Sequence, residues 1–559
     1  MVFYDNGVLG LRERRKRLGV FVFAVLFTVL LGTGTAWAAA YTLTNNAGSA
    51  CVTKTCTMSA IIADSTHSNW TGTSTFGFMP GNGNTVTIPD GYHLTIDQNW
   101  TIGASTANNT TSSIYMSKTG IVEVRSGVTL RARGDLLYDV TAASSTALLL
   151  DAGSALIFDS SQAASPTTTR YRFGGDGNGY AIRFLFANGT PSSHVTVTSD
   201  LTNGALPGQF RSSPVGNGGS QYGGSLTATY TDFSYIGDGT ATGQAWQIAD
   251  PNFGFGFPYF SLQHCTIDHS GPNFQGSGIG TDATFILNYD TFTNSLGSTN
   301  IGVGSGGSVG GKYQVTNNVF DKAWGGGTGG CSGGAPQVGG TFSNNFFGGS
   351  MCYDPSSTVT DSFIRGLGTP WLIKGDLTNG YYADDVTNHD NPHWSQYDST
   401  RPITVSGFIF DDPDNISADS GEMWTEGTTP TPMVEGFNNN IELPTKTGSS
   451  NSELMASTNV VPNATTTIIN MLHNTWVGGT QFGMVQMNEG GASKDPVAAV
   501  ESNLAWSNSG GYSKVSTVQT AAMLTNSVTL ADYNSADSHL TQTITCPSCT
   551  NQGNGYIGV

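Results

Sequence analysis

Short alternating segments that end in an asparagine corner recur along the middle of the chain. Residues 312–316 alternate polar and apolar positions, and Asn317-Asn318 and two apolar residues follow. Residues 341–347 repeat this phrase 27 residues later, with Asn344-Asn345 at the corner. Looser copies lie before and after these two. The corner positions of all the copies are Asp232, Cys265, Asp290, Asn318, Asn345, Phe408, Asn474 and Asn503, so successive corners are 33, 25, 28, 27, 63, 66 and 29 residues apart. A regular period with one short strand phrase per repeat predicts a solenoid.

The predicted solenoid is built from strands. Each phrase holds too few apolar residues for a core of its own, but coils stacked ~4.8 Å apart share one continuous core. The 74 glycines and the lack of stripes with a helical period argue against a helical solenoid. Because Asn tolerates the left-handed backbone of a sharp corner, we expect Asn318 and Asn345 to be buried in a stacked ladder. The steps of 63 and 66 residues fit two coils each, or one coil with an insertion.

Strand, Asn-Asn corner, aromatic residue and long loop together resemble the pectate-lyase-like superfamily over roughly residues 190–535. The resemblance implies an all-β fold of secreted bacterial-type proteins: a right-handed, single-stranded parallel β-helix, here with an N-terminal β-rich cap region. It also implies that the Asn corner joins the second and third strands of each coil, and that the binding cleft lies on the first. The superfamily includes polysaccharide lyases, glycoside hydrolases, esterases, phage tailspikes and adhesins, so the resemblance specifies fold more closely than function.

The two ends of the chain differ from its middle. Residues 1–38 have a basic segment, an apolar run and the small-residue site Ala36-Trp37-Ala38, which predicts a signal peptide cleaved after Ala38. The alternative is a membrane anchor, although the apolar run is short for a membrane span. Residues 39–190 predict a β-rich cap and the first coils, and residues 83–91 are similar to the start of the glycine-rich extracellular β domain of hyaluronan-processing and ciliary proteins. The β-helix is expected over 191–535, and 536–559 is expected to be a tail of a truncated chain.

Seven cysteines suit an oxidising compartment, and the formal charge of −18 argues against nucleic-acid binding. Cys51 and Cys56 are close enough for a local disulfide, and Cys331 and Cys352 flank one coil. Cys546 and Cys549 form a CxxC pair that we interpret as a structural disulfide. Cys265 occupies a ladder corner, so we expect it to be buried and free.

The repeat is lost between about residues 349 and 402, which predicts a long insertion on one face of the solenoid. Aromatic side chains there and nearby could stack on sugar rings or simply pack the loop onto the coils. We take four of them as substrate-binding candidates: Trp371, Tyr382, Trp394 and Trp424.

The densest acidic segment begins at Asp411 and ends at Glu422. Carboxylates this close repel one another unless they are separated, protonated or bridged by a cation, and hard oxygen ligands favour Ca²⁺. The candidate ligands are Asp412, Asp414, Asp419 and Glu422, although their spacing is not that of an EF-hand. A solvated acidic loop and a pair of catalytic carboxylates are the alternatives.

Three acidic residues, Asp268, Asp321 and Asp411, fall three positions past a corner, where the resemblance places the rim of the cleft. Asp321 and Asp411 would lie three coils apart, roughly 14 Å, if the step of 63 residues hides one coil. That distance is too long for a direct acid–base pair. We therefore expect Asp411 and Asp412 to carry the chemistry or to hold its metal, and Asp321 with Lys322 to bind a neighbouring sugar. His264 and His269 are interpreted as structural.

Two reactions stay open on these residues. A lyase needs a base and a cation beside a uronate carboxyl, for which Lys322, Lys374, Arg365 or Arg401 could serve with Ca²⁺. A hydrolase needs two carboxyl groups, for which Asp321, Asp411 and Asp412 are the choices. The sequence thus favours a secreted or cell-surface, monomeric protein that acts on an extracellular polysaccharide, with no nucleic-acid partner and no membrane span after signal cleavage. The alternative is a non-catalytic adhesin or structural rod.

Overall fold

The computed structural model of the chain describes most residues of the N-terminal half and the strands of the C-terminal half. The described residues are 40–43, 51, 53–63, 70–72, 85–103, 112–139, 145–163, 165–175, 183–211, 225–239, 245–247, 260–271, 284–296, 299–301, 312–324, 340–348, 358–365, 371–372, 376–383, 394–397, 404–411, 420–421, 424–426, 435–442, 452–453, 455–458, 467–477, 485–487, 497–501, 504–506, 513–515, 523–525, 528–530, 550–551 and 557–558. The predicted signal peptide, the candidate ligands Asp412, Asp414, Asp419 and Glu422, and four of the seven cysteines lie outside them.

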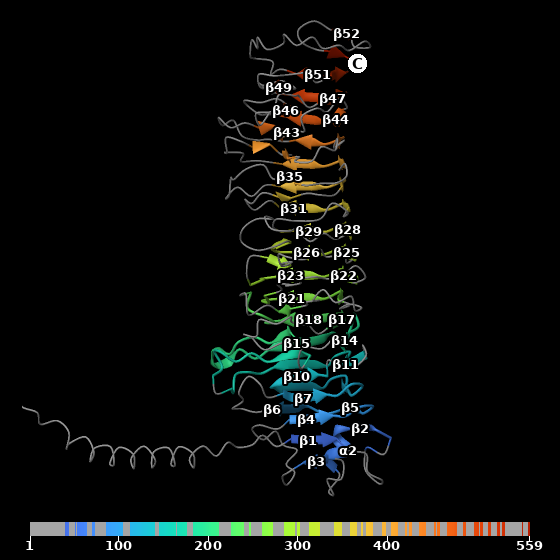
Figure 1. Ribbon diagram of the computed structural model, residues 1–559, viewed down its shortest axis with the longest axis vertical. Helices are drawn as coiled ribbons and strands as arrows, with labels where there is room; N and C mark the ends of the chain where they lie inside the picture. Colours follow the sequence, from blue (N-terminus) through green and yellow to red (C-terminus); the bar gives the residue numbers. More distant parts are fainter. Residues whose placement is uncertain are drawn as a thin grey trace, which may run out of the picture.

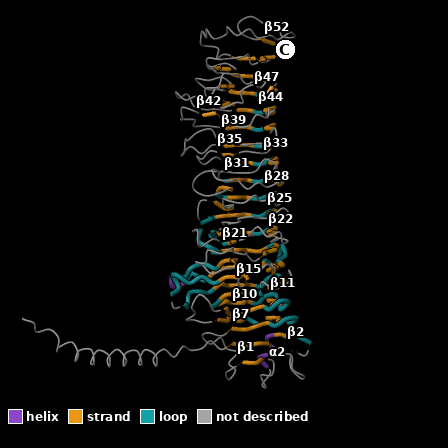
Figure 2. Tube along the Cα trace, in the orientation of Figure 1, coloured by secondary structure: helices purple, strands orange, loops and turns teal. Residues whose placement is uncertain are grey.

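The molecule is a parallel β-helix, a long rod of stacked coils (Figures 1 and 2). Successive strands of one coil belong to three different sheets, which we call sheets 1, 2 and 3. Each strand of sheet 2 pairs in parallel with the strand before it and the strand after it, so that sheet is an open ladder from β2 to β50. The fold class expected from the sequence is confirmed.

Sheets 2 and 3 run the length of the rod. The strands of sheet 2 are β2 (Thr55–Thr57), β5 (His93–Ile96), β8 (Ile121–Val124), β11 (Ser145–Asp151), β14 (Arg183–Asn188), β17 (Ser225–Thr229), β20 (Phe260–Gln263), β22 (Thr284–Asn288), β25 (Lys312–Thr316), β28 (Gly340–Ser343), β30 (Thr358–Thr360), β33 (Asp376–Thr378), β36 (Thr404–Ser406), β40 (Glu435–Asn438), β44 (Thr467–Leu472), β47 (Val497–Glu501) and β50 (Met523–Thr525). Those of sheet 3 are β6 (Trp100–Gly103), β9 (Thr129–Arg133), β12 (Ala155–Phe158), β15 (Val195–Ser199), β18 (Thr231–Ser234), β21 (Thr266–Asp268), β23 (Thr291–Thr293), β26 (Val319–Phe320), β29 (Phe346–Phe347), β31 (Phe363–Arg365), β34 (Tyr381–Ala383), β37 (Ile409–Asp411), β41 (Ile441–Glu442), β45 (Thr475–Val477), β48 (Leu504–Trp506) and β51 (Val528–Leu530).

Sheet 1 has two parts. The N-terminal part contains β3 (Trp70–Gly72), β1 (Ala40–Leu43), β4 (Thr85–Ile88), β7 (Ser112–Met116), β10 (Asp135–Tyr138), β13 (Arg172–Gly175), β16 (Gln209–Arg211) and β19 (Trp246–Gln247). The C-terminal part contains β32 (Trp371–Leu372), β35 (Trp394–Tyr397), β39 (Trp424–Glu426), β43 (Met455–Thr458), β46 (Val485–Met487) and β49 (Ser513–Val515). All these strands pair in parallel except β1 with β3.

Smaller elements complete the described structure. They are the pairs β24 (Thr299–Ile301) with β27 (Ala323–Trp324), β38 (Ser420–Gly421) with β42 (Ser452–Glu453) and β52 (Thr550–Asn551) with β53 (Ile557–Gly558), the helix α2 (Met58–Ala63) and the 3₁₀ turn η1 (Thr202–Gly204). Among the described residues, no helix has the length and hydropathy needed to cross a membrane.

The corner between sheets 2 and 3 repeats with one backbone conformation. Its first residue has a positive φ in ten successive coils, at Tyr230, His264, Tyr289, Asn317, Asn344, Asp361, Asn379, Gly407, Asn439 and His473. Its second residue points inward, and Asn318 and Asn345 are only 1% and 3% exposed. The predicted buried ladder is therefore confirmed, as is the buried, free Cys265. The predicted local disulfide Cys51–Cys56 is present as well.

The insertion predicted at about 349–402 needs correction, because sheets 2 and 3 continue through it. The ladder of sheet 2 passes from β28 through β30 and β33 to β36, in parallel register throughout. The step of 63 residues thus hides two further corners, at Asp361-Ser362 and Asn379-Gly380. The step between the first two copies also changes. Asp232 pairs with Thr266 and not with Cys265, so this step is 34 residues, one more than the sequence pattern gave.

The core is a column of inward side chains contributed once per coil by each sheet. On sheet 3, Phe292, Phe320 and Phe347 are buried and stack with ring centroids 4.9 and 5.2 Å apart. Strand alternation places the residues before and after them on the outer face. Any binding surface of the rod is therefore built from outward positions of the strands and from loops.

Candidate functional site

Asp268 and Asp321, two of the predicted rim residues, hold the coil between them. Thr293 Oγ1 and Asn294 Nδ2 donate to Asp268 at 3.0 and 2.8 Å, while Ser295 donates through its backbone N and its Oγ to Asp321 at 2.8 and 2.7 Å. The hydrogen bond from Asn294 and the contact with His269 lower the pKa of Asp268. Both carboxylates thus have a structural role, in addition to any role toward a ligand.

Asp321 and Asp411 are further apart than the sequence pattern gave. Four pairings separate β26 from β37, through β29, β31 and β34. At ~4.8 Å per pairing this is roughly 19 Å, instead of the 14 Å expected for one hidden coil. Asp411 ends β37, whereas Asp412, Asp414, Asp419 and Glu422 lie outside the described residues. No group of three or more His, Cys, Asp or Glu side chains that could hold a metal occurs among the described residues.

The four predicted aromatic residues do not share one sheet. Trp371, Trp394 and Trp424 begin β32, β35 and β39, three neighbouring strands of sheet 1. Trp371 pairs with Trp394, but Trp424 pairs with Ser395, one position further along. Tyr382 instead lies on sheet 3, in register with Phe410.

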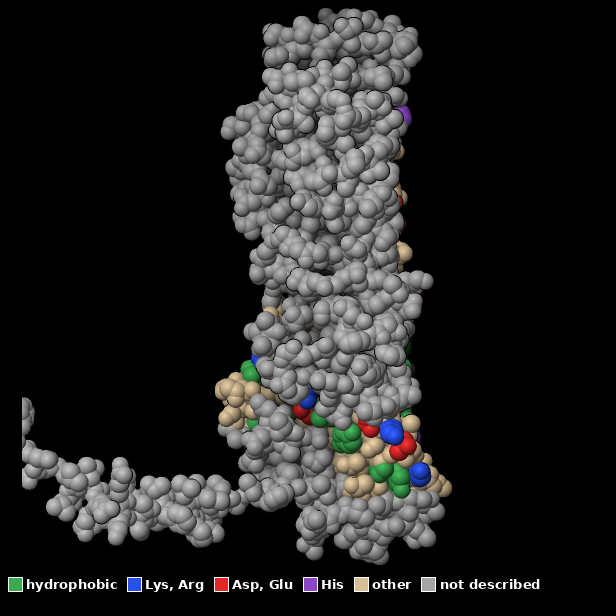
Figure 3. All heavy atoms as spheres, viewed as in Figure 1, with side chains coloured by type: hydrophobic (Ala, Val, Ile, Leu, Met, Phe, Trp, Pro, Cys, Tyr) green, Lys and Arg blue, Asp and Glu red, His purple; other side chains and the backbone are tan. Residues whose placement is uncertain are grey.

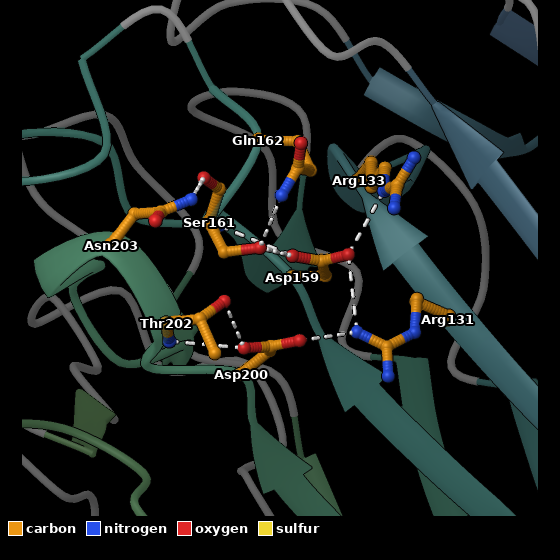
Figure 4. A network of polar contacts seen from close by, with 8 residues as sticks. All are labelled: Arg131, Arg133, Asp159, Ser161, Gln162, Asp200, Thr202 and Asn203. Carbon is orange, nitrogen blue, oxygen red and sulfur yellow. Dashed lines mark hydrogen bonds and ion pairs between the residues drawn. The ribbon is translucent and has the colours of Figure 1, made fainter.

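A dense polar network lies at the N-terminal end of sheet 3, and its charged side chains bond to one another (Figure 4). Arg131 Nη1 lies 3.1 Å from Asp159 and 2.6 Å from Asp200, and Arg133 Nε lies 2.9 Å from Asp159. The remaining oxygen of Asp159 accepts from the backbone N of Ser161 at 3.1 Å and from its hydroxyl. Although burial opposes it, these hydrogen bonds lower the pKa of Asp159. A carboxylate satisfied on both oxygens by its own protein is a clamp between coils.

A second acidic cluster lies on the outer face of sheet 2, near the N-terminal coils where the charged side chains visible in Figure 3 gather. Glu123 projects from β8 and is 12% exposed. It accepts a hydrogen bond from Thr95 Oγ1 at 3.0 Å, and Arg125 Nε lies 3.4 Å from its other oxygen. His93 Nε2 lies 2.9 Å from Glu123 but makes no aligned hydrogen bond. Three side chains, from β5 and the turn after β8, thus surround the carboxylate of Glu123.

The partner that makes this cluster unusual is Asp151, at the end of β11. Leu150 pairs with Val124, which places Asp151 beside Arg125 and diagonally across from Glu123. Burial raises the pKa of Asp151, and the like charge of Glu123 and a hydrogen bond between the two carboxyl groups raise it further, against the opposing effect of Arg125. Two carboxyl groups therefore lie close together on an outward-facing surface, and one of them has a raised pKa, an arrangement suited to acid–base chemistry.

Asp151 is also the first residue of an uninterrupted row of hydrogen-bonding side chains, which we call the polar row. The row consists of Asp151, Asn188, Thr229, Gln263, Asn288, Thr316, Ser343, Thr360, Thr378, Ser406 and Asn438, in register on successive strands of sheet 2. Every member is at least partly exposed. At ~4.8 Å per strand the polar row is roughly 48 Å long.

The sequence pattern did not lead to this cluster, although it contained a signal. A β-rich cap and first coils were expected over residues 39–190, but the asparagine phrase that set the register is missing there, since Gly127 and Gly153 form the corners. Continuing the period of 25–30 residues into the N-terminal region would have brought the two carboxylates onto neighbouring strands.

No protein-family model, curated protein or solved structure matches the chain. The geometry on the outer face of sheet 2 is therefore the main guide to function.

Proposed function

We propose that this protein is a carbohydrate-active β-helix protein that hydrolyses glycosidic bonds of a polysaccharide on the outer face of sheet 2. The observation that carries the proposal is the position of Asp151. It belongs to a carboxyl pair with Glu123 and also begins the polar row. The pair supplies the two carboxyl groups that glycoside hydrolysis needs. The polar row supplies hydroxyl and amide partners along the length of an extended chain of sugars.

In this proposal the two carboxyl groups have separate roles. Asp151, whose pKa is raised, is the proton donor to the leaving oxygen, and Glu123 is the base or nucleophile. His93 and Arg125, within 2.9 and 3.4 Å of Glu123, hold that carboxylate in place. Hydrogen-bonded carboxyl groups lie closer than the ~5–5.5 Å typical of a retaining pair, so the two groups must move apart when a sugar enters.

Hydrolysis is favoured over lysis because the described site has the two carboxyl groups that a hydrolase needs. The calcium-assisted lyase reading stays a proposal that rests on Asp412, Asp414, Asp419 and Glu422. Calorimetry with Ca²⁺ tests it directly, comparing the intact protein with an Asp412→Asn, Asp414→Asn double variant. If both proteins give equal heats, the acidic segment is not the calcium site.

A panel of polysaccharides tests the proposed activity. We expect new reducing ends on at least one polymer, without the ultraviolet absorbance of an unsaturated product. The matched variants are Glu123→Gln and Asp151→Asn, with Asp232→Asn on sheet 3 as the control. Reducing ends accompanied by that absorbance would instead establish a lyase. No product from any polymer would contradict an enzymatic role.

The second candidate function is a non-catalytic surface rod or adhesin. It is favoured by the use of carboxylates as inter-coil clamps, since Asp159 and Asp321 each bond their neighbours through both oxygens. On this reading the polar row would bind a glycan without cleaving it. Binding to a polymer that is never degraded, with weaker binding after Thr360→Val and Thr378→Val, would support it.

We further propose that the chain is exported, in accordance with the predicted signal peptide and the Cys51–Cys56 disulfide. Membership of the pectate-lyase-like superfamily is part of the same proposal. It rests on the parallel coils and the asparagine corners.

A further inference from the structure

The ten residues of the polar row that follow Asp151 are all uncharged. They are asparagine, glutamine, serine and threonine residues from Asn188 to Asn438, and they extend over roughly 43 Å of the rod. Hydroxyl and amide side chains both donate and accept hydrogen bonds, whereas an ionised carboxylate only accepts them. Sugar hydroxyl groups also donate and accept. The row therefore matches a ligand whose polar groups are hydroxyl groups.

Two neighbouring members of the row are already oriented by their own hydrogen bonds. Asn288 Oδ1 accepts from Thr316 Oγ1 at 2.8 Å and from Asn317 Nδ2 at 3.1 Å, and Gln263 Nε2 donates to Ser261 Oγ at 3.1 Å. Among the described residues, the amide N of Asn288 and the amide O of Gln263 have no further side-chain partner. One donor and one acceptor thus stand on adjacent strands, which is the pair of partners that a single sugar hydroxyl can use.

Carboxylates flank the row near its middle. Asp361 follows Thr360 at the corner and is exposed. Asp376 lies two positions before Thr378, on the same face of β33, and is partly exposed. A carboxylate carried by a sugar at Thr360 and Thr378 would therefore meet negative charge on both sides of the row.

Basic residues lie at the margins of this face. Arg125 continues the register of the row beyond Asp151, and its Nε lies 3.4 Å from Glu123. Lys312 and Arg183 begin β25 and β14, four and five positions before the row, or roughly 13 and 17 Å along the strand. Arginine and lysine are the usual partners of a ligand carboxylate. The row offers none of them, and the chain as a whole carries a formal charge of −18.

We propose that the polysaccharide of this protein is neutral, and that the polar row excludes polyuronates, polymers with a carboxylate on every sugar. The inference rests on the proposed binding of a polysaccharide along the polar row and names the chemical class of that ligand. The row selects the polymer by its charge, with Asp361 and Asp376 as the residues that repel an acidic chain. The carboxyl pair at the end of the row acts on the polymer so selected.

Affinity electrophoresis against a panel of neutral polysaccharides and polyuronates tests the selection. The Glu123→Gln variant is used beside the parent protein so that binding is measured without cleavage. We expect every polymer that retards the protein to be neutral, in the presence of a chelator and in the presence of Ca²⁺. A polyuronate that binds as tightly as the best neutral polymer, with or without Ca²⁺, would overturn the inference. So would the failure of every neutral polymer to bind.

Chemical modification of the best neutral polymer isolates the effect of charge. One sample is carboxymethylated, and the matched control is hydroxyethylated to the same degree, which adds similar bulk without charge. We expect the carboxymethylated polymer to bind at least tenfold more weakly than the control at about 10 mM salt, where the Debye length is about 30 Å. The difference should shrink at about 150 mM salt, where that length is about 8 Å. Equal binding of the two polymers at low salt would contradict the selection.

A charge introduced into the row should reverse the preference. The test variant is Thr360→Lys with Thr378→Lys, and the matched control is Thr360→Gln with Thr378→Gln. We expect the lysine variant to bind the carboxymethylated polymer at least tenfold more tightly than the glutamine variant. Circular dichroism checks that each variant is folded, and Asp361→Lys at the exposed corner gives a second comparison. Equal binding by the lysine and glutamine variants would mean that the polymer does not lie along the row.

These results separate the selection of the polymer from its hydrolysis. Neutral polymers that bind along the row and are never cleaved would overturn the proposed hydrolysis and support the selection. New reducing ends from a polyuronate, with none from any neutral polymer, would overturn the selection and support the hydrolysis.

Discussion

At the corner between sheets 2 and 3, single side chains bond one coil to the next. Asn318 Oδ1 accepts from the backbone N of Asp290 at 2.8 Å, and Asn345 Oδ1 accepts from that of Asn318 at 3.0 Å. Asn318 Nδ2 also donates to the carbonyl of Leu287 at 3.0 Å. Each asparagine therefore satisfies backbone groups that the corner would otherwise leave buried and unpaired.

Replacing Asn318 by Leu tests the contribution of one ladder side chain. We expect the free energy of unfolding to fall by ~1–3 kcal/mol, because the backbone N of Asp290 loses its acceptor. Gln314→Leu is the matched control, since Gln314 is exposed on β25, the strand before that corner, and it should change stability by less than about 0.5 kcal/mol. Chemical denaturation measures both. Equal stabilities for the two variants would contradict the ladder.

Asp290 is the ladder residue whose charge should make stability depend on pH. It is fully buried, and burial raises its pKa well above the usual value even though Cys265 and Asn288 donate backbone hydrogen bonds to it. A carboxyl with a raised pKa in the folded state adds stability below its unfolded pKa, and this stability is lost as the pH rises through the folded pKa.

The variant Asp290→Asn places the ladder amide where the carboxyl was. We expect its melting temperature to exceed that of the parent at about pH 7 and to equal it at about pH 4. At neutral pH the free energy of unfolding of the variant should exceed that of the parent by on the order of 1–3 kcal/mol, the cost of a poorly satisfied buried polar group. Thermal melts at both pH values measure it. A variant that is less stable than the parent at neutral pH would show that the ionised carboxylate is required.

Among the elements, the coils from β30 to β36 show how the ladder adapts when asparagine is absent. Ser362 Oγ accepts from the backbone N of Asn345 at 3.2 Å, in place of an amide. At the next corner a Cβ on Gly380 would lie 2.2 Å from the ring of Phe408. Phe408, the corner residue of the following coil, therefore occupies the space that a side chain at Gly380 would need.

A double-mutant cycle tests this exchange between neighbouring coils. Gly380→Asn alone should destabilise the protein by ~1–3 kcal/mol, because the new side chain overlaps the ring of Phe408. Adding Phe408→Asn should restore part of that loss by completing the amide ladder. Strict additivity of the two substitutions, measured by chemical denaturation, would mean that Gly380 and Phe408 do not share one space.

These coils also separate the features that the sequence predicts from those that it does not. The period, the strand phrase and the Asn-Asn pairs predicted the solenoid, its corners and the buried Cys265, because each reflects a local backbone requirement. At Ser362 a hydroxyl takes the place of the amide, and at Gly380 the ring of Phe408 fills the space of a side chain, so no residue type marks these corners. For the same reason the spacing of Asp321 and Asp411 was too short by one coil. The pairing of Glu123 with Asp151 depends on register in a region whose corners are glycines.

Across the whole molecule, the parallel stacking turns a residue type repeated once per coil into an axial row. The polar row on sheet 2 and the buried phenylalanine column on sheet 3 both follow from this geometry. The polar row begins at the carboxyl pair, so a polysaccharide that lies along it would bring one glycosidic bond to Glu123 and Asp151. The central claim is that these two carboxyl groups carry the reaction.

The most direct test compares kcat/KM on a responding polysaccharide for the parent, Glu123→Gln, Asp151→Asn, Asp412→Asn and the control Asp232→Asn. Removing either member of an acid–base pair typically costs ~10²–10⁴-fold. We expect losses of that size for Glu123→Gln and Asp151→Asn, and values within about two-fold of the parent for Asp232→Asn and Asp412→Asn. Full activity of Glu123→Gln and Asp151→Asn, with activity abolished in Asp412→Asn, would contradict the account and place the chemistry at the acidic segment.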